Sequence, residues 1–242
     1  MIREGSSMDD SLLTVKNLSA WYDRERKVLS DFSLELLEHE AVGLIGLNGA
    51  GKTTFLKVLS GLLSGFDAEG IWFQGRPVRM REQSFKLCRY TVFDEDHSFQ
   101  YFTFREYLTY VSHAYGEKLS GVGELVKGFG FERYEDVLLK ELSTGNRKKC
   151  FLITAFALKP KLLLLDEPVN GLDFQSTEYL YRQISGYREY GTVLFSSHVL
   201  ESIALTADRV MVLENGQIRR SFEGSRICAS DMREALRYED DI

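Results

Sequence analysis

The sequence has few cysteines and no long apolar run. Its three cysteines, Cys88, Cys150 and Cys228, have the spacing of neither a metal site nor a disulfide framework. We therefore expect reduced, structural thiols in a cytosolic protein. No stretch approaches the ~20 apolar residues that span a bilayer, and no secretory signal opens the chain, so we expect no membrane-spanning segment.

The sequence also lacks a positive net charge, internal repeats and low-complexity linkers. The net charge of −6 argues against nonspecific nucleic-acid binding, and no nucleic-acid partner is expected. The hydrophobic share of 44% and charged share of 27% are typical of globular proteins. We expect all 242 residues to form one α/β domain with a frayed start over residues 1–11.

The most informative stretch is G-L-N-G-A-G-K-T-T at residues 46–54, a phosphate-binding loop of the G-x-x-x-x-G-K-[ST] type. A chance glycine-rich turn is the alternative. An expected buried strand over residues 41–45 and an expected helix over 52–63 favour the loop. Lys52 would reach the β- and γ-phosphates, and the Thr53 hydroxyl would bind Mg²⁺. The expected nucleotide-binding residues here are Leu47, Asn48, Gly49, Ala50, Gly51, Lys52, Thr53 and Thr54.

A second motif follows four consecutive leucines at residues 162–165, which predict a strand buried on both faces of a parallel sheet. Such strands deliver their last residues to the edge where ligands bind. Asp166 would hold Mg²⁺, and Glu167 would polarise a water aimed at the γ-phosphate. An acidic pair after a strand is often a solvated turn, but a phosphate loop upstream favours the catalytic interpretation.

A third motif, L-S-T-G-N at residues 142–146, precedes a helical pattern over residues 147–158, with Ser143 or Thr144 as candidate N-cap. In its order after the phosphate loop and before Asp166, it resembles the L-S-G-G-Q signature of ATP-binding cassette (ABC) ATPases. The resemblance covers residues 12–224. It also matches residues 169–173 to the D-loop, His198 to the switch histidine and Tyr22 to the adenine-stacking aromatic.

The resemblance implies a P-loop NTPase core with a mainly parallel sheet, an N-terminal antiparallel β subdomain and a helical signature subdomain. The core would comprise residues 12–93 and 160–224, the helical lobe residues 94–159, and a short tail residues 225–242. It also implies ATP and Mg²⁺ as cofactors and head-to-tail pairing of two cassettes, as a homodimer or with a similar ATPase.

In such a pair, Ser143 and Gly145 would contact the nucleotide on the opposite chain, and Asp173 would serve the same interface. Glu167 and His198 would be the catalytic residues. A lone histidine after a strand is commonly a surface residue. For His198, its position directly after Ser196 and Ser197 favours the switch role.

The chain departs from the family pattern in the signature, where Thr144 and Asn146 replace glycine and glutamine. Should position 144 require a positive φ, a β-branched residue there would be strained. Otherwise its hydroxyl would offer another hydrogen-bond donor. We expect slower turnover and not a dead site, and Thr144→Gly should raise the ATPase activity.

A second departure concerns the Q-loop, where the family places a glutamine that touches Mg²⁺. After an expected strand over residues 89–93, Asp94 occupies this place, counting back from the expected helix start at Thr103. Glu95 is the next candidate, and Gln100 lies too close to the helix. A carboxylate can bind Mg²⁺ through its hard oxygens, so Asp94 joins Thr53 and Asp166 as a candidate metal ligand.

Aromatic residues are concentrated in the segment that follows. Phe99, Tyr101, Phe104 and Tyr107 are among them, and helical spacing assigns part of the set to a local core. The remainder would form an exposed aromatic surface. In the family this lobe receives a short helix of the membrane subunit, so we predict that residues 94–110 contact a permease. Alanine at Phe99 or Tyr101 should uncouple transport.

Three function classes follow. The leading one is the ATPase subunit of a transporter whose transmembrane permease is a separate chain, placing the protein at the inner face of the cell membrane. The compact insert favours export, with an importer as the rival. A soluble ABC ATPase acting on the ribosome or nucleic acid is the second class. The third, a P-loop kinase, is disfavoured by residues 142–146 and His198.

Overall fold

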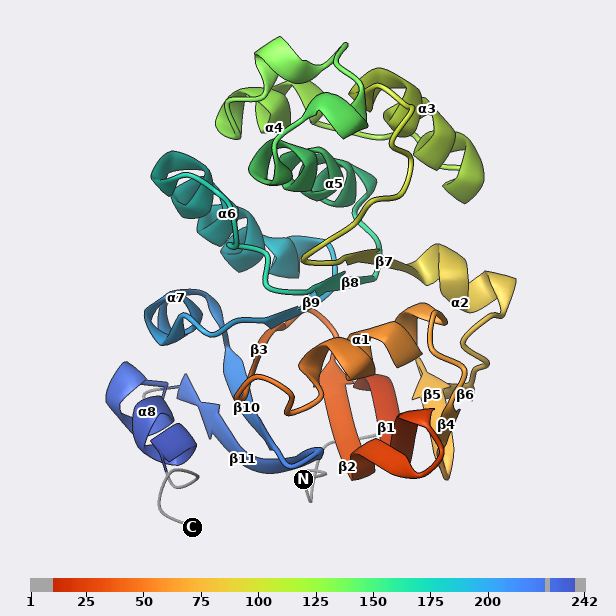
Figure 1. The fold of residues 1–242 in the computed structure, drawn as a ribbon, viewed down its shortest axis with the longest axis vertical. Coiled ribbons are helices and arrows are strands. Elements are labelled where there is room, and N and C mark those ends of the chain that lie inside the picture. Colours follow the sequence, from red (N-terminus) through yellow and green to blue (C-terminus); the bar gives the residue numbers. More distant parts are fainter. Residues whose placement is uncertain (1–10, 225–226, 238–242) are drawn as a thin grey trace.

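The structure, a computed structural model, describes residues 11–224 and 227–237. Two sheets and a helical lobe are stacked along the long axis of the molecule (Figure 1). Of the frayed start expected over residues 1–11, residues 1–10 lie outside the described residues, and Ser11 already belongs to a strand. Residues 225–226 and 238–242 of the expected tail also lie outside them.

The central sheet has six strands in the order β11-β10-β3-β9-β8-β7. Five of them run parallel, and only β11 pairs antiparallel, with β10. Their bounds are β3 (Ala41–Ile45), β7 (Arg89–Val92), β8 (Leu162–Leu165), β9 (Thr192–Ser196), β10 (Arg209–Glu214) and β11 (Gln217–Glu223). The strands expected at 41–45 and 162–165 are confirmed, and the one expected at 89–93 ends one residue earlier.

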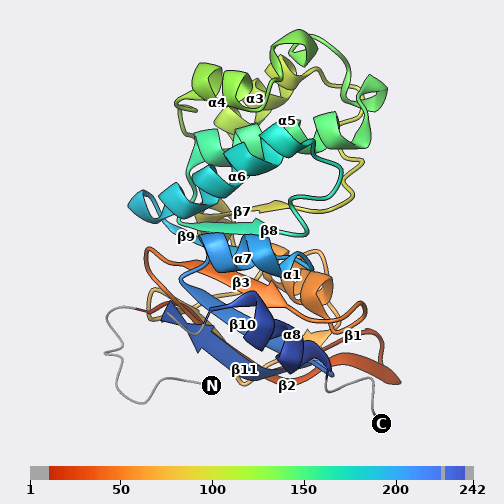
Figure 2. The same ribbon diagram turned by 90° about the vertical axis from the view of Figure 1, so that its left-hand side faces the viewer.

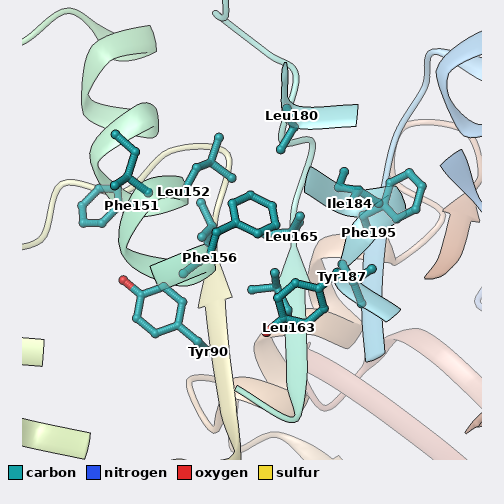
Figure 3. Close-up of a cluster of buried hydrophobic side chains, with 14 of the residues drawn as sticks. Tyr90, Phe151, Leu152, Phe156, Leu163, Leu165, Leu180, Ile184, Tyr187 and Phe195 are labelled. Atoms are coloured by element: carbon teal, nitrogen blue, oxygen red, sulfur yellow. The ribbon is translucent and has the colours of Figure 1, made fainter. Parts of the chain in front are cut away.

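The alternation of strand side chains builds a core on each face of this sheet. Leu162 and Leu164 of β8 belong to one cluster, whereas Leu163 and Leu165 belong to the other. All four are inaccessible to solvent, as expected for a strand covered on both sides. Figure 3 shows Leu163 and Leu165 packed with Phe156.

The second sheet is antiparallel and covers one face of the central sheet through helix α1 (Lys52–Ser60). Its strands are β1 (Ser11–Asp23), β2 (Arg26–Leu37), β4 (Phe66–Asp67), β5 (Gly70–Phe73) and β6 (Arg76–Pro77), and helix α2 (Gln83–Cys88) leads from it into β7. The helix expected over 52–63 is shorter than predicted, because Gly61 ends it in the left-handed conformation.

The helical lobe lies beyond the other face of the central sheet (Figure 2). It contains α3 (Phe104–Tyr115), α4 (Val122–Gly128), two short 3₁₀ turns at Glu132–Tyr134 and Leu139–Glu141, and α5 (Thr144–Leu158). The remaining elements are α6 (Phe174–Gly186), a 3₁₀ turn at Tyr187–Glu189, α7 (Leu200–Thr206) and α8 (Ala229–Arg237). The fold is therefore an α/β P-loop core with an antiparallel β subdomain and a helical signature subdomain, as predicted.

Helix α5 carries the signature at its N-terminus and is buried along most of its length. Its residues from Lys148 to Leu158 are all buried, so its solvent-accessible residues are restricted to the first turn. The sequence predicted this helix three residues late, because the polar first turn does not show the helical periodicity. This placement holds the signature at the carboxyl edge of the central sheet.

Candidate active site

The phosphate loop connects β3 to α1 and adopts the curled conformation that its glycines permit. Gly49 and Gly51 have φ of 87° and 111°, in the left-handed region that favours glycine. A Cβ on Gly46 would lie 2.4 Å from the carbonyl oxygen of Leu213, so even alanine cannot be accommodated there. Helix α1 begins directly after Gly51 with no acidic residue in its first turn, leaving its positive end available to an anion.

The ammonium group of Lys52 lies within the loop that it follows. Its Nζ donates to the Gly46 carbonyl at 2.7 Å and lies 3.8 Å from Oε1 of Glu167. The residue is 7% exposed, so its charge is largely shielded from solvent. A phosphate group entering the loop would therefore meet a cation that is already held in position.

The Thr53 hydroxyl and the Asp166 carboxylate form the candidate metal site. Thr53 Oγ1 donates to both carboxylate oxygens, at 3.1 and 2.9 Å, and Ser196 Oγ donates to Oδ1 at 2.8 Å. Burial raises the pKa of Asp166, and the hydrogen bonds from Ser196 and Thr53 oppose that rise. A bound cation would relieve the cost of burying this carboxylate.

Glu167 and His198 are in direct contact. Nδ1 of His198 lies 2.8 Å from Oε2 of Glu167, and the backbone N–H of His198 donates to the same oxygen at 3.2 Å. Glu167 has φ of 44°, an unusual conformation for a residue with a Cβ, which costs about 1–3 kcal/mol. Such strain persists only where surrounding contacts hold the backbone.

These groups surround an open pocket of about 920 Å³. It contains most of the predicted nucleotide residues together with residues that the motifs did not indicate. The lining comprises Tyr22, Asp23, Arg26, Val28, Gly46, Leu47, Asn48, Gly49, Gly51, Lys52, Thr53, Thr54, Asp94, Glu167, Asn170, Ser197, His198 and Leu236. Tyr22 is 60% exposed at the mouth, and Lys57 Nζ lies 5.5 Å from its ring centre.

Among the predicted residues, Ala50, Asp166, Ser143, Gly145 and Asp173 are not part of this lining. Ala50 lines a neighbouring hollow, and Asp166 reaches the pocket through the Thr53 hydroxyl. The other three lie on the signature side of the molecule.

The signature forms the N-terminus of α5. Ser143 is the N-cap, and its Oγ accepts from the backbone N–H of Asn146 at 3.2 Å. Both Ser143 and Thr144 are exposed. A Cβ on Gly145 would lie 2.1 Å from the carbonyl oxygen of Gly171, so the glycine allows the helix to contact the loop after β8.

Thr144 is the first residue of α5 and is not among the residues with positive φ. The condition for strain, a positive φ at this position, is therefore not met. Its substitution by glycine has no strain to relieve.

Asp173 caps helix α6 rather than reaching the pocket of its own chain. Its carboxylate accepts from the Ser176 N–H at 2.9 Å and from Lys149 Nζ at 2.6 Å. The hydrogen bonds from Lys149 and then Ser176 lower the pKa of Asp173 to about 2. Within one chain this aspartate is structural, and its role at an interface stays a prediction.

Asp94 lines the pocket, but its carboxylate already has partners. Oδ1 contacts Lys148 Nζ at 2.5 Å, and Oδ2 accepts from Asn170 Nδ2 at 3.1 Å. The sequence motifs did not indicate Lys148, because it lies on α5 just beyond the signature residues 142–146. The motifs also did not indicate Ser196, whose hydroxyl accepts from the Glu167 N–H at 2.8 Å. The available signal for Lys148 was its place among three consecutive basic residues, 147–149, directly before the apolar part of the helix.

The comparison with known families agrees with this geometry. The ABC transporter family model matches residues 29–170. The chain belongs to the ABC transporter family. AlbC of Bacillus subtilis (strain 168), a putative ABC transporter ATP-binding protein, is 35% identical over 222 residues, covering 87% of this chain and 91% of that protein.

Two further likenesses extend over most of this chain. PotA of Borreliella afzelii (strain PKo), a spermidine/putrescine import ATP-binding protein, is 29% identical, covering 87% of this chain and 62% of its own. A solved ATP-binding subunit of an ABC transporter has a TM-score of 0.80 at 28% identity, covering 93% of this chain and 92% of its own. The protein is thus an ABC transporter ATP-binding subunit and an ATP-hydrolysing cassette.

Proposed function

We propose that this cassette drives transport through a separate membrane permease, using ATP-dependent pairing of two cassettes. Within residues 11–224 and 227–237, no helix is long and apolar enough to cross a membrane. The path for cargo would then lie on another chain, with this subunit bound at the cytoplasmic side of the permease.

The arrangement of Glu167 between Lys52 and His198 carries the proposal for hydrolysis. Oε1 of Glu167 faces the Lys52 ammonium at 3.8 Å, and Oε2 faces the His198 ring at 2.8 Å. A carboxylate at the wall of a phosphate pocket can accept a proton from water as that water attacks the γ-phosphate. Lys52 would stabilise the charge on the transferred phosphoryl group, and His198 would orient the water.

Thr53 and Asp166 fit Mg²⁺. Both offer hard oxygen atoms in mutual contact, and the described residues hold no cluster of three His, Cys, Asp or Glu that would cage another metal. Mg²⁺ commonly uses one or two carboxylates together with substrate phosphates. When bound, it would neutralise charge on the β- and γ-phosphates.

The exposed N-terminus of α5 would complete a second site. Ser143 and Gly145 do not line the pocket of their own chain, although the helix start offers N–H groups suited to an anion. A second cassette, identical or similar, would bring its own phosphate loop and nucleotide against this surface. Each site would then combine groups from two chains.

A variant that binds but does not cleave ATP tests this proposal. Glu167→Gln should bind Mg²⁺–ATP and hydrolyse it ~10²- to 10⁴-fold more slowly, because the amide cannot accept the proton. Light scattering with Mg²⁺–ATP should show its mass double, whereas Glu167→Gln combined with Ser143→Glu should stay single. A Glu167→Gln chain that remains single with bound ATP, even beside its permease, would contradict pairing.

Export is the direction that we propose, since the segment between the phosphate loop and the signature is compact. An importer subunit is the alternative, and the similarity to PotA, an import ATP-binding protein, supports it. Inside-out vesicles that contain the cassette and its permease separate the two, because an exporter would accumulate cargo upon ATP addition and an importer would not.

The aromatic segment before α3 would contact the permease. Phe99 is half-buried, with ring centres of Tyr107 and Tyr110 each 4.9 Å from its own. Tyr101 is 76% exposed, with Lys140 Nζ 4.8 Å from its ring centre. Phe99→Ala would therefore disturb packing, which makes Tyr101→Ala the better test. It should reduce transport and leave basal ATPase unchanged, whereas unchanged transport would place the contact elsewhere.

A further inference from the structure

Lys148 is a buried cation whose ammonium joins three segments of the chain. It belongs to α5, the helix that carries the signature, and it is 3% exposed. Its Nζ contacts Oδ1 of Asp94, which follows β7, and donates to the main-chain carbonyl of Glu167, which follows β8, at 3.1 Å. A charge removed from water to this extent requires partners, and these two supply them.

Asn170 closes the arrangement into a ring. Its Nδ2 donates to Oδ2 of Asp94 at 3.1 Å, and its backbone N–H donates to the Glu167 carbonyl at 3.1 Å. Lys148, Asp94, Asn170 and the Glu167 carbonyl thus form a continuous set of hydrogen bonds. We name these four groups the carbonyl clamp.

The carbonyl clamp acts on a backbone that needs support. Glu167 has φ of 44°, and its N–H is held separately by Ser196 Oγ at 2.8 Å. With both the N–H and the carbonyl of Glu167 held, the φ and ψ angles of this residue are restricted. The side chain then points to Lys52 and His198 at the distances described above.

We propose that Lys148 is a positioning residue for ATP hydrolysis, holding the Glu167 main chain so that its carboxylate meets the attacking water. The inference rests on the general-base role proposed for Glu167. Because Lys148 lies on α5, a displacement of the signature helix would move the Glu167 carbonyl with it. A movement of the helical lobe would in this way change the position of the Glu167 carboxylate.

The same contacts give Asp94 a different role from that of a metal ligand. Its two oxygens are engaged by Lys148 and Asn170, and its charge is balanced by the ammonium. Asp94 would hold Lys148 in place. Substitution should then alter turnover without altering the Mg²⁺ requirement.

Lys149 provides a matched control on the same helix. It is similarly buried, at 6% exposed, and it also pairs with an aspartate, Asp173, at 2.6 Å. No hydrogen bond joins it to Glu167 among the contacts of the described residues. Removing either lysine takes a buried ammonium away from its aspartate partner, but only the Lys148 ammonium also hydrogen-bonds to Glu167.

The experiment compares Lys148→Met and Lys149→Met, each alone and combined with Glu167→Gln, in the full chain. Folding is checked by thermal melting and nucleotide binding by fluorescent ATP. Lys148→Met should lower kcat by about 10- to 100-fold with KM for ATP changed less than about threefold, because a small displacement of a catalytic group is costly. In the Glu167→Gln background, followed by single-turnover hydrolysis, it should cause no further loss.

The opposite pattern overturns the inference. If Lys148→Met slows hydrolysis by the same factor in both backgrounds, as we expect for Lys149→Met, then Lys148 does not act through Glu167. Failure of Glu167→Gln itself to slow hydrolysis would instead reject the role proposed for that carboxylate, so the two failures are distinguishable.

If Lys148→Met does not fold, Asp94→Asn replaces it in this experiment. Asp94 lines the pocket and is only half-buried, so its substitution should disturb folding less. It should lower kcat about three- to tenfold, again only when Glu167 is present. The Mg²⁺ concentration for half-maximal activity should stay unchanged. A several-fold rise in that concentration would identify Asp94 as a metal ligand and contradict the carbonyl clamp.

Discussion

The phosphate-loop region and the signature region of this cassette differ in where their partners lie. In the first, Lys52, Thr53, Glu167 and His198 converge on one pocket within a single chain. In the second, the N-terminus of α5 is exposed and contributes nothing to that pocket. The phosphate-loop region thus assembles its pocket within one chain, whereas the signature region can contribute to a nucleotide site only when a second molecule packs against it.

The largest effect should come from the phosphate-loop region. Lys52→Met removes the cation that faces both the loop carbonyls and Glu167, so kcat/KM for ATP should fall at least ~10²-fold. Steady-state ATPase assays measure it, with the exposed Lys127→Met of α4 as the control that should behave like the unsubstituted protein. A loss smaller than tenfold would mean that the loop binds phosphate through its backbone alone.

The signature region should respond through packing rather than charge. The Cβ of Gly145→Ala would meet the Gly171 carbonyl, so α5 and the following loop must separate. We expect ATPase to fall about tenfold or more, while one chain still binds nucleotide, because the pocket is unchanged. Equal loss of nucleotide binding would show that the two regions are not separable.

Gly186→Ala is the matched control for that substitution, since nothing lies within 4 Å of the added Cβ. The residue is in α6 with φ of −80°, which alanine accepts. Its thermal stability should stay equal or rise, by up to about 1 kcal/mol in the free energy of unfolding.

Thr144→Gly sharpens the comparison at the first residue of α5. Because Thr144 lacks positive φ, glycine relieves no strain and costs helix stability, by roughly 0.5–1 kcal/mol. We expect no rise in ATPase and a slightly lower melting temperature. A clear gain in turnover would show that the threonine side chain obstructs the facing cassette.

The smallest effect concerns pH and Asp173. Because the folded-state pKa of about 2 lies below the ordinary value of 3.8, its ionisation stabilises the folded protein above pH 4. That contribution declines as pH falls from 4 toward 2. Asp173→Asn keeps a side chain that can cap α6 but loses the charge that pairs with Lys149, so it should be less stable than the parent at pH 7, by about 1 kcal/mol.

Urea unfolding at pH 7 and pH 3 checks this prediction, and the gap between the two proteins should narrow at the lower pH. Asp136→Asn, at an exposed ion pair with Arg105, should change stability by less than about 1 kcal/mol at either pH. A gap for Asp173→Asn that is constant with pH would mean that ionisation contributes nothing.

Local pattern was sufficient for the phosphate-loop region. Four leucines identified β8, and the glycines of residues 46–54 predicted a loop that the structure forms with Gly49 and Gly51 at positive φ. These features depend on backbone conformation and on alternation along one strand, which are encoded within short stretches of chain.

Pattern was insufficient where contacts join distant segments. The position of Asp94 in the sequence predicted a metal ligand, which stays a prediction, and it gave no indication of the contact with Lys148, 54 residues away. The sequence also left open whether Thr144 has a positive φ, and the structure places it in the first turn of α5, where it does not. Both depend on the packing of α5 against the loops after β7 and β8.

The sequence by itself determined the class of chemistry and the order of strand, loop and helix around the phosphates, because neighbouring residues set local backbone geometry. Only the tertiary structure decided which charges meet. It brought Glu167 to His198 and Lys148 to Asp94, since partners far apart in the chain are chosen by burial and packing. It also left Ser143 and Thr144 exposed at the start of α5, because the loop after β8 contacts this helix start at Gly145.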